Sequence, residues 1–159
     1  MTLDEISAFV HERIPLTRTL AARAVHWDGT TLRLAAPLAP NVNHRGTGFG
    51  GSLSAVAILS GWLLLHLRLR EAGIAARLVI QRSAFDYDAP VDGDFTATAT
   101  APEPGAWERF VETLGRHRAA RVKVLSVVAC ASGEGGRHEG TFVATRVEQA
   151  GSPGGAAPG

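Results

Sequence analysis

A polar, glycine-rich loop is the part of this sequence best suited to chemistry. It spans residues 41–51 (NVNHRGTGFGG) and combines amide and imidazole side chains with four glycines. An asparagine such as Asn43 can hold a water molecule or a carbonyl group, and His44 titrates near neutral pH. Gly50 and Gly51 allow the backbone to approach a ligand closely. The loop therefore predicts a small-molecule site built largely from backbone.

The residues that follow the loop predict a helix buried on nearly every side. Residues 52–65 carry no charge and are mostly Leu, Ala, Ile and Val, and His66 and Arg68 begin a charged end. The stretch is shorter than a comfortable membrane span. The first N–H groups of a helix have no internal partner and lie at the positive end of its dipole. The backbone N–H near Gly51 would therefore suit a developing oxyanion. A core helix with a glycine-rich entry loop is the alternative that the pattern leaves open.

A second set of polar residues follows this helix. Residues 77–87 read as a strand. Alternation puts Gln81, Ser83, Phe85 and Tyr87 on one face and Asp86 on the other. Asp86 could accept a proton, or could be a surface carboxylate. Ser83 shows no His–Asp partner in the sequence, which argues against a nucleophilic serine. Tyr87 is expected to pack its ring and to bond through its hydroxyl.

Composition limits the class of protein. The 159 residues suit a single domain, predicted over 1–148, and the net charge of +1 gives no nucleic-acid footprint. Cys130 is the one cysteine, so no disulfide can form within the chain. The histidines show no metal-ligand spacing, so we expect neither metal nor cofactor. Because residues 1–9 carry acids and no signal-like pattern, we expect a cytoplasmic protein with no membrane partner.

The order of predicted elements indicates an α+β fold. We expect a helix at 3–14, with Thr2 and Glu5 spaced as in a capping box, and a helix at 52–71, while residues 106–114 could form a short helix or in part a strand. We expect strands at 17–27, 31–38, 77–87, 94–101, 121–132 and 139–147, and a disordered tail at 149–159. The GEGG run, 133–136, is expected to turn the chain between the last two strands. A single buried helix among strands predicts a curled antiparallel sheet wrapped around it. The open strand edges and remaining apolar surface invite a second copy of the chain.

Two segments resemble the hotdog superfamily. PLAPNVNHRGTGFGGSLSAVAILSGW, residues 37–62, looks like the YiiD C-terminal type of thioesterase within it. FDYDAPVDGDF, residues 85–95, is similar to the segment that follows the central helix in hotdog acyl-CoA thioesterases. The resemblance covers about residues 10–148. It implies a dimer, or a dimer of dimers, with active sites at the subunit interface. The implied substrate is a thioester of coenzyme A or acyl carrier protein.

The resemblance also implies roles for single residues. Asn43 lies six residues before Phe49-Gly50-Gly51, as an Asn precedes a His-Gly-Gly triplet in related enzymes, and would position the thioester or water. The N–H of Gly51 would polarise the carbonyl group. Relatives often carry a carboxylate on the helix seven to nine residues later, where this chain has only Ile58, Leu59 and Ser60. The base would then be Asp86 or His44. The expected substrate contacts are Asn41, Thr47, Phe49, Gly50, Ser52, Ser83 and Tyr87.

The missing helix carboxylate keeps two further functions open. One is a non-catalytic protein that binds acyl thioesters. The other is a hydratase or dehydratase on the same fold, although such enzymes pair a histidine with a carboxylate and the NVNH run of this loop has an asparagine in place of the aspartate. Thioester hydrolysis is the function that the sequence favours.

Overall fold

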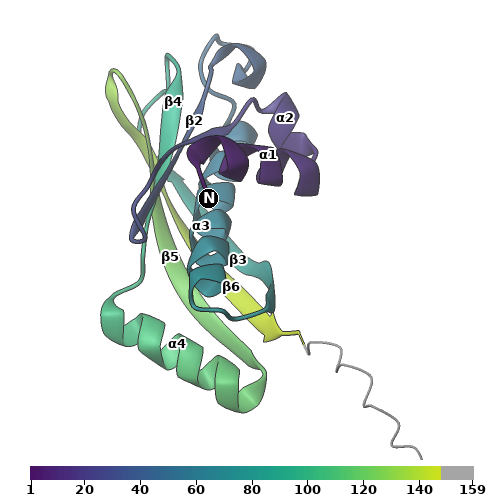
Figure 1. Cartoon of the computed structure of the whole chain (residues 1–159). Coiled ribbons are helices and arrows are strands. Elements are labelled where there is room, and N and C mark those ends of the chain that lie inside the picture. The colour runs from purple at the N-terminus through teal and green to yellow at the C-terminus, as the bar shows by residue number, and fades with distance from the viewer. Residues whose placement is uncertain (148–159) are drawn as a thin grey trace, which may run out of the picture.

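The chain forms a six-stranded antiparallel sheet curled around one long helix (Figure 1). The computed structural model describes residues 1–147, so the tail predicted at 149–159 lies outside the described residues. Strand order in the sheet is β1-β2-β4-β5-β6-β3. The helices are α1 (Leu3–Arg13), α2 (Leu16–Thr19), α3 (Gly50–Glu71) and α4 (Pro104–His117). The strands are β1 (Arg23–Trp27), β2 (Thr31–Ala36), β3 (Ala76–Tyr87), β4 (Phe95–Thr100), β5 (Ala119–Cys130) and β6 (Gly133–Arg146).

The N-terminal region holds one confirmed helix and one wrong strand boundary. In α1, Thr2 and Glu5 form the predicted capping box: the Thr2 hydroxyl accepts from the Glu5 N–H, and the Glu5 carboxylate accepts from the Thr2 N–H. The strand predicted from residue 17 starts only at Arg23, because the short helix α2 comes first. The buried Thr17 hydroxyl donates to the Ile14 carbonyl at 2.8 Å, which holds this extra turn against α1.

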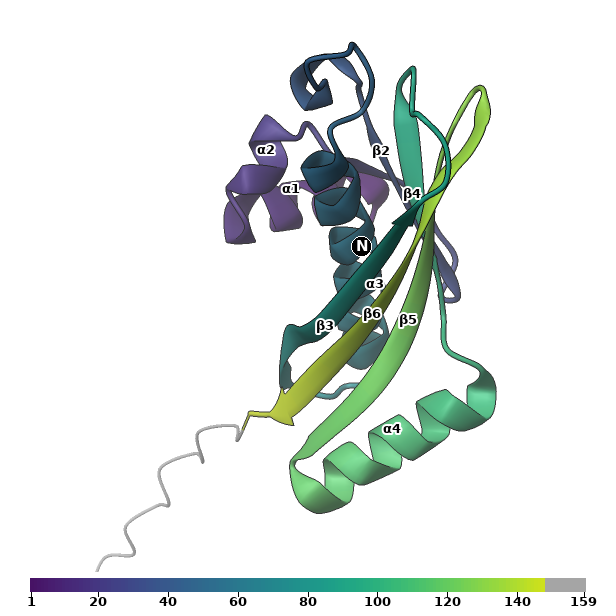
Figure 2. The same cartoon turned by 180° about the vertical axis from the view of Figure 1, so that it is seen from behind.

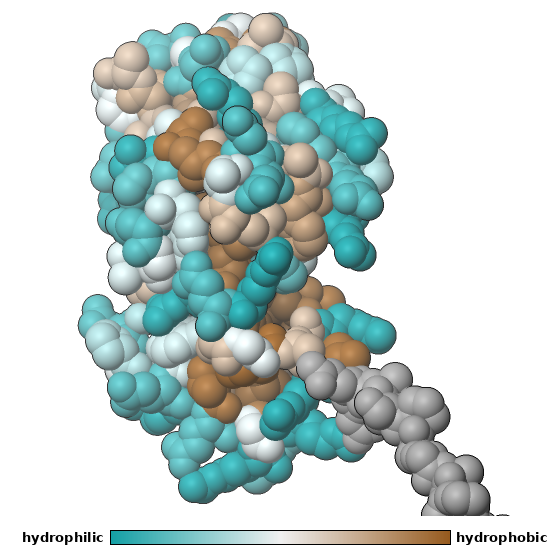
Figure 3. Space-filling model, viewed as in Figure 1, coloured by the Kyte–Doolittle hydropathy of each residue, from teal (hydrophilic) through white to brown (hydrophobic). Residues whose placement is uncertain are grey.

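The central helix is confirmed and is longer than its uncharged stretch. Two thirds of its most apolar window is buried in the fold, as expected for the core helix of a soluble protein, although its length and composition would also allow a membrane span. The sheet covers one side of α3, and Figure 3 shows brown, apolar surface on the uncovered side. Ala55, Ile58 and Trp62 are only partly buried, in an apolar groove that Leu16 of α2 and Ile80 of β3 also line. Gly73 follows the helix with a φ of 69°, the left-handed conformation that ends many helices.

Strand β3 forms one edge of the sheet and is almost entirely exposed (Figure 2). Only Leu78 is buried among its twelve residues. The pairing with β6 slips between Ile80 and Arg82, so Gln81 is an extra residue. Because of this bulge, the Gln81 side chain accepts from the exposed Arg121 on the outer face, and the prediction that it shares a face with Ser83 is wrong.

The last hairpin turns earlier than predicted. β6 begins at Gly133, so the GEGG run lies inside the strand, and the turn falls at Ala131 and Ser132. Gly136 has a packing role, because a Cβ atom there would overlap the ring of Phe85 on β3. These glycines allow strands to approach closely where the sequence pattern indicated a turn.

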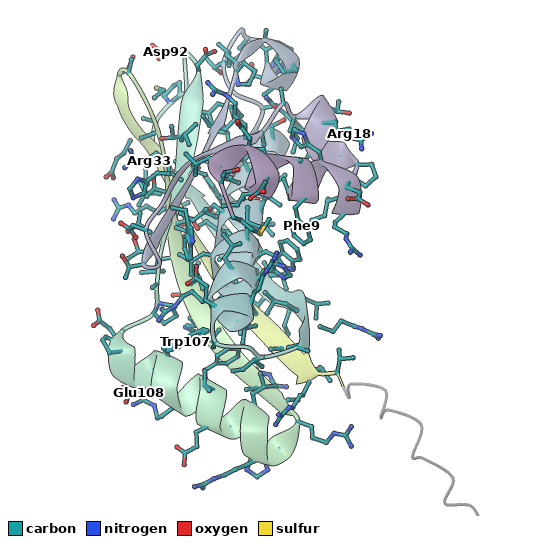
Figure 4. The ribbon with its side chains drawn as sticks, viewed as in Figure 1. Phe9, Arg18, Arg33, Asp92, Trp107 and Glu108 are labelled. Carbon is teal, nitrogen blue, oxygen red and sulfur yellow. The ribbon has the colours of Figure 1, made fainter. Side chains whose placement is uncertain are left out.

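Helix α4 is longer than predicted and closes the lower end of the sheet (Figure 1). Phe110 and Leu114 are buried on its inner face. Trp107 lies on the side of α4 that faces α3, while Glu108 lies on the outer side (Figure 4). The Arg68 guanidinium at the end of α3 stacks 4.1 Å above the Trp107 ring. The open question of helix or strand in this segment is therefore settled as helix.

Candidate functional site

The start of α3 offers backbone donors without a cap. Phe49 is the N-cap residue, and its side chain cannot cap the helix. Within residues 1–147, the N–H groups of Gly50, Gly51 and Ser52 have no hydrogen-bond partner. Gly51 is exposed, whereas Ser52 is buried. Unpaired donors at the positive end of a 22-residue helix form a site for an anion or a polarised carbonyl oxygen.

The side chain of Asn43 fixes the shape of the loop that precedes α3. Its Nδ2 donates to the Thr47 Oγ1 at 3.0 Å, and its Oδ1 accepts the N–H of Arg45 at 2.8 Å and of Thr47 at 3.2 Å. The Gly48 N–H then donates to the Val91 carbonyl at 2.7 Å, which anchors the loop. Both side-chain atoms of Asn43 are therefore engaged by its own loop, and so is the Thr47 hydroxyl.

Asn41 is a buried brace of the same loop. The residue is 1% exposed, and its Nδ2 donates to the carbonyls of Leu20 at 2.9 Å and Pro37 at 2.8 Å. Its own carbonyl accepts the Phe49 N–H at 2.7 Å. Asn41 thus joins α2, the end of β2 and the start of α3. This geometry gives Asn41 a role in shaping the loop, and its contact with substrate stays a prediction.

Tyr87 brings strand β3 to the start of α3. Its hydroxyl donates to the Gly50 carbonyl at 2.9 Å, and its ring lies 4.4 Å from that of Phe85. A Cβ atom on Gly50 would press against the Tyr87 ring at 3.1 Å, which explains the glycine. Tyr87 and Phe49 are more than half exposed, at 57% and 55%. Two aromatic surfaces therefore flank the free N–H groups.

The two predicted bases do not join this group within one chain. Asp86 pairs across the sheet with the exposed Arg137, so its side chain projects from the outer face, opposite to Tyr87. His44 is exposed at the loop tip, and its side chain makes no hydrogen bond to any described residue. Both assignments remain predictions.

Ser83 lies on the same inner face of β3 as Tyr87 and has a partner that the sequence does not reveal. Its Oγ is 2.9 Å from the Nε2 of His138 on β6. His138 is 1% exposed, and burial lowers the pKa of its imidazole below the usual value of 6.5. The two residues are 55 positions apart, and only the β3–β6 register brings them together.

A small polar cluster lies between this pair and α3. Ser126 on β5 is the cross-strand neighbour of His138. The buried Ser126 hydroxyl donates to the Ala57 carbonyl at 3.2 Å and lies 3.1 Å from the Ser60 Oγ. Ser60, one of the positions where relatives carry a carboxylate, is fully buried and points into the fold. The polar cluster therefore sits level with the second turn of α3.

No metal centre accompanies these residues. Across residues 1–147, no three His, Cys, Asp or Glu side chains are grouped closely enough to hold an ion. The groups that gather at the start of α3 are backbone donors, aromatic rings and a tyrosine hydroxyl. Such a site can polarise a carbonyl group and exclude water from one side of it.

Comparison with known proteins places this geometry in context. The sequence profile of a family described as "Putative thioesterase (yiiD_Cterm)" matches residues 3–146. A protein of unknown function from Chlorobaculum tepidum is 26% identical, with a TM-score of 0.85, covering 91% of this chain and 94% of that one. A "putative thioesterase" from Shewanella oneidensis is 24% identical, with a TM-score of 0.80 and coverages of 90% and 96%. A thioesterase from Haemophilus influenzae is 15% identical, with a TM-score of 0.74 and coverages of 94% and 94%. The predicted hotdog fold and the predicted family are both confirmed.

Proposed function

Because the chain belongs to the YiiD C-terminal family of thioesterases, we propose that it hydrolyses a thioester of coenzyme A or of acyl carrier protein. The uncapped start of α3 carries this proposal. It presents the N–H groups of Gly50, Gly51 and Ser52 without partners in the described chain. A thioester carbonyl needs such donors when attack by water turns its oxygen into an oxyanion.

The proposed reaction uses the backbone of Gly51 as the main donor. Water attacks the thioester carbon, the oxyanion lies against the Gly51 N–H, and the C–S bond then breaks to release the thiol and the acid. Asn43 contributes by fixing the loop that carries the helix start, through its bonds to Thr47 and Arg45. Phe49 and Tyr87 provide apolar surface beside the reacting group. The proposed reaction depends more on preorganised hydrogen-bond donors than on a strong nucleophile.

We also propose that the active form is a homodimer or a larger even-numbered assembly. Strand β3 leaves a twelve-residue edge unpaired on one side, with Val79 54% exposed. The partly exposed Ala55, Ile58 and Trp62 add apolar surface on α3. Long bare edges normally pair or are blocked. The single free Cys130 suits the reducing cytoplasm, which we propose as the compartment.

A binding protein without catalysis is the second candidate. The observation that favours it is the absence of any Asp, Glu or His from residues 50–65 of α3. Such a protein would hold an acyl thioester at the same helix start without supplying a base. It would bind the substrate but release no free thiol.

A panel of thioesters tests the two candidates. Purified full-length protein is incubated with short-, medium- and long-chain acyl-CoA and with acyl carrier protein thioesters, and free thiol is measured. Hydrolysis of any member supports the proposal. Saturable binding without thiol release supports the binding protein, and conversion of enoyl-CoA without thiol release would indicate a hydratase.

Gly51→Val tests the proposed oxyanion site. The Val side chain would keep the substrate carbonyl from reaching the N–H of residue 51, so we expect turnover to fall by at least about 100-fold, the loss typical of losing one oxyanion donor. A Cβ atom at Gly51 would overlap only the exposed Phe49 ring, and the φ of Gly51 is not in the left-handed region, so the fold should tolerate the change. Gly93→Val is the matched control, because a Cβ atom there meets open space. Normal hydrolysis by a folded Gly51→Val protein would mean that the oxyanion lies elsewhere.

A further inference from the structure

His138 is the only titratable side chain that is buried within residues 1–147. Its Nε2 contacts the Ser83 hydroxyl, whereas its Nδ1 has no hydrogen-bond partner in the described chain. A buried polar atom without a partner normally costs about 1–3 kcal/mol. The Ser83–His138 pair is therefore a candidate for a role beyond packing.

The geometry gives His138 one route to the surface. The imidazole is 1% exposed, so neither substrate nor bulk water can reach it directly. Ser83 is exposed on the inner face of the edge strand, in line with Phe85 and Tyr87. Within residues 1–147, the Ser83 hydroxyl is the one group hydrogen-bonded to the imidazole, and so it offers the direct proton path to the surface.

We infer that Ser83 and His138 together supply the proton acceptor for thioester hydrolysis, in place of the carboxylate that α3 lacks. This inference rests on the proposed function. The pair lies beside Ser126, which bonds to the Ala57 carbonyl, and so stands level with the helix segment that has no carboxylate. Ser83 is the catalytic residue that touches the attacking water, and His138 acts through it.

The proton steps balance without any other reagent. As water attacks the thioester carbon, its proton passes to the Ser83 Oγ, and the Ser83 hydroxyl proton passes to the His138 Nε2. The new C–O bond forms and the C–S bond breaks. The proton on His138 then returns through Ser83 to the departing sulfur. The products are the free acid and the free thiol, and both side chains end as they began.

The pair must serve the helix start of a second copy. Ala57 lies six residues after Gly51, roughly 9 Å along the helix axis at 1.5 Å per residue. Ser83 also precedes Tyr87, whose hydroxyl bonds at the helix start, by four strand residues, roughly 13 Å at 3.3 Å per residue. Within one chain, Ser83 and the Gly51 N–H are thus too far apart to act on one carbonyl group. A second copy that packs along the open β3 edge could place its own α3 start against Ser83. Each active site would then contain Gly51 from one copy and Ser83–His138 from the other.

The surroundings of His138 determine the pH dependence. Ser83 faces it from β3 and Ser126 from β5, and the adjoining turn of α3 around Ala57 carries no charge. Glu139, the next residue on β6, raises the pKa but projects from the other face, and burial is the larger effect and lowers it. The base must be neutral, so the rate should fall on acidification only below about pH 6.5, the ordinary histidine pKa.

The test compares Ser83→Ala, Ser83→Thr and His138→Gln by kcat, KM and pH profile on the best substrate of the wild-type protein. We expect Ser83→Ala and His138→Gln to lower kcat by about 100-fold, the lower range for loss of a general base, with little change in KM. Ser83→Thr keeps the hydroxyl on a strand-compatible residue and should retain most activity. The acid limb of the pH profile should disappear in Ser83→Ala.

The outcomes separate this inference from the proposed function. If the wild-type protein hydrolyses thioesters and folded Ser83→Ala keeps its kcat and its acid limb, the inference is wrong and the proposed function stands. If the wild-type protein hydrolyses no thioester, both fail. His138→Gln alone would not decide the matter if it unfolds, because the residue is buried; the exposed Ser83 variants decide it.

A subunit-mixing experiment tests the sharing between copies. Gly51→Val and Ser83→Ala proteins, each inactive alone, are unfolded together, refolded and assayed. A shared site predicts recovery to about a quarter of wild-type activity, because half of the dimers are then hybrids with one intact site each. Hybrids shown by mass spectrometry to form, but without recovered activity, would overturn the placement of the pair across two copies.

Discussion

The two edge strands of the sheet, β1 and β3, differ in how far a helix covers them. At the β1 edge, helix α1 supplies side-chain partners to the strand: the Ser7 hydroxyl accepts the Ala24 N–H at 2.9 Å, and the His11 Nε2 donates to the Ala22 carbonyl at 2.7 Å. At the β3 edge, no helix lies over the strand of twelve residues (Figure 2), and within residues 1–147 its one backbone bond from a helix side chain is from the Trp62 indole of α3, which donates to the Leu78 carbonyl at 3.0 Å. A strand edge that is covered by its own chain has no need of a partner, whereas a bare one invites pairing.

The bare edge is also the strand that lines the candidate site. Ser83 and Tyr87 lie on the inner face of β3, and Tyr87 bonds to the start of α3. The covered β1 strand contributes none of the candidate residues. Changes at β3 should therefore affect both the association of copies and the rate of hydrolysis, whereas changes at β1 should affect neither. The following predictions test this contrast, from the largest expected effect to the smallest.

Val79→Lys should separate the copies and stop turnover. Val79 is 54% exposed on β3, and an added charge on an edge strand blocks pairing. We expect a protein of about 17 kDa by light scattering, the mass of one chain, in place of a dimer, with hydrolysis lowered more than tenfold. Leu125→Lys is the matched control, because Leu125 is 60% exposed on the central strand β5 and has no edge to block. A dimeric and fully active Val79→Lys protein would show that the copies associate elsewhere.

Asn43→Ala should have an intermediate effect that leaves association unchanged, because the loop before α3 belongs to neither edge. The change removes both the bond to Thr47 Oγ1 and the bonds that Oδ1 accepts, so the loop carrying Gly51 should loosen. We expect kcat to fall about tenfold, which corresponds to ~1.4 kcal/mol. Thr47→Ala removes only one of these bonds and should have a smaller effect. Wild-type kinetics for Asn43→Ala would limit Asn43 to a loop residue without influence on the reaction.

The sequence predicted the parts of the molecule that local patterns determine. The uncharged run after the glycine loop identified α3, and the Thr2–Glu5 spacing identified the start of α1. Prediction from the sequence failed where packing between distant segments determines the strand boundaries and register. The bulge at Gln81 and the extension of β6 through the GEGG run depend on how β3, β5 and β6 fit together.

The same limit explains what was predicted of the candidate site. The helix start is a local feature, so Gly50 and Gly51 could be named from the sequence alone. The Ser83–His138 pair depends on strand register across 55 residues, and no spacing rule indicates it. Asp86 was an attractive base because carboxylates commonly accept protons, but strand alternation directs it to the outer face.

Ser7→Ala should have the smallest effect and should be confined to stability. The change removes the hydroxyl that accepts the Ala24 N–H, a bond worth about 1 kcal/mol net. For a protein of this size, the melting temperature should fall by roughly 2–4 °C. Dimer mass and kcat should remain at wild-type values, because β1 takes no part in the proposed interface or site. Glu12→Gln, at an exposed position of α1 and nearly neutral in helix propensity, is the control and should leave the melting temperature unchanged. If Ser7→Ala instead forms larger assemblies, the β1 edge can pair with another chain as readily as the β3 edge. The difference between the two edges would then come from the cover that α1 provides.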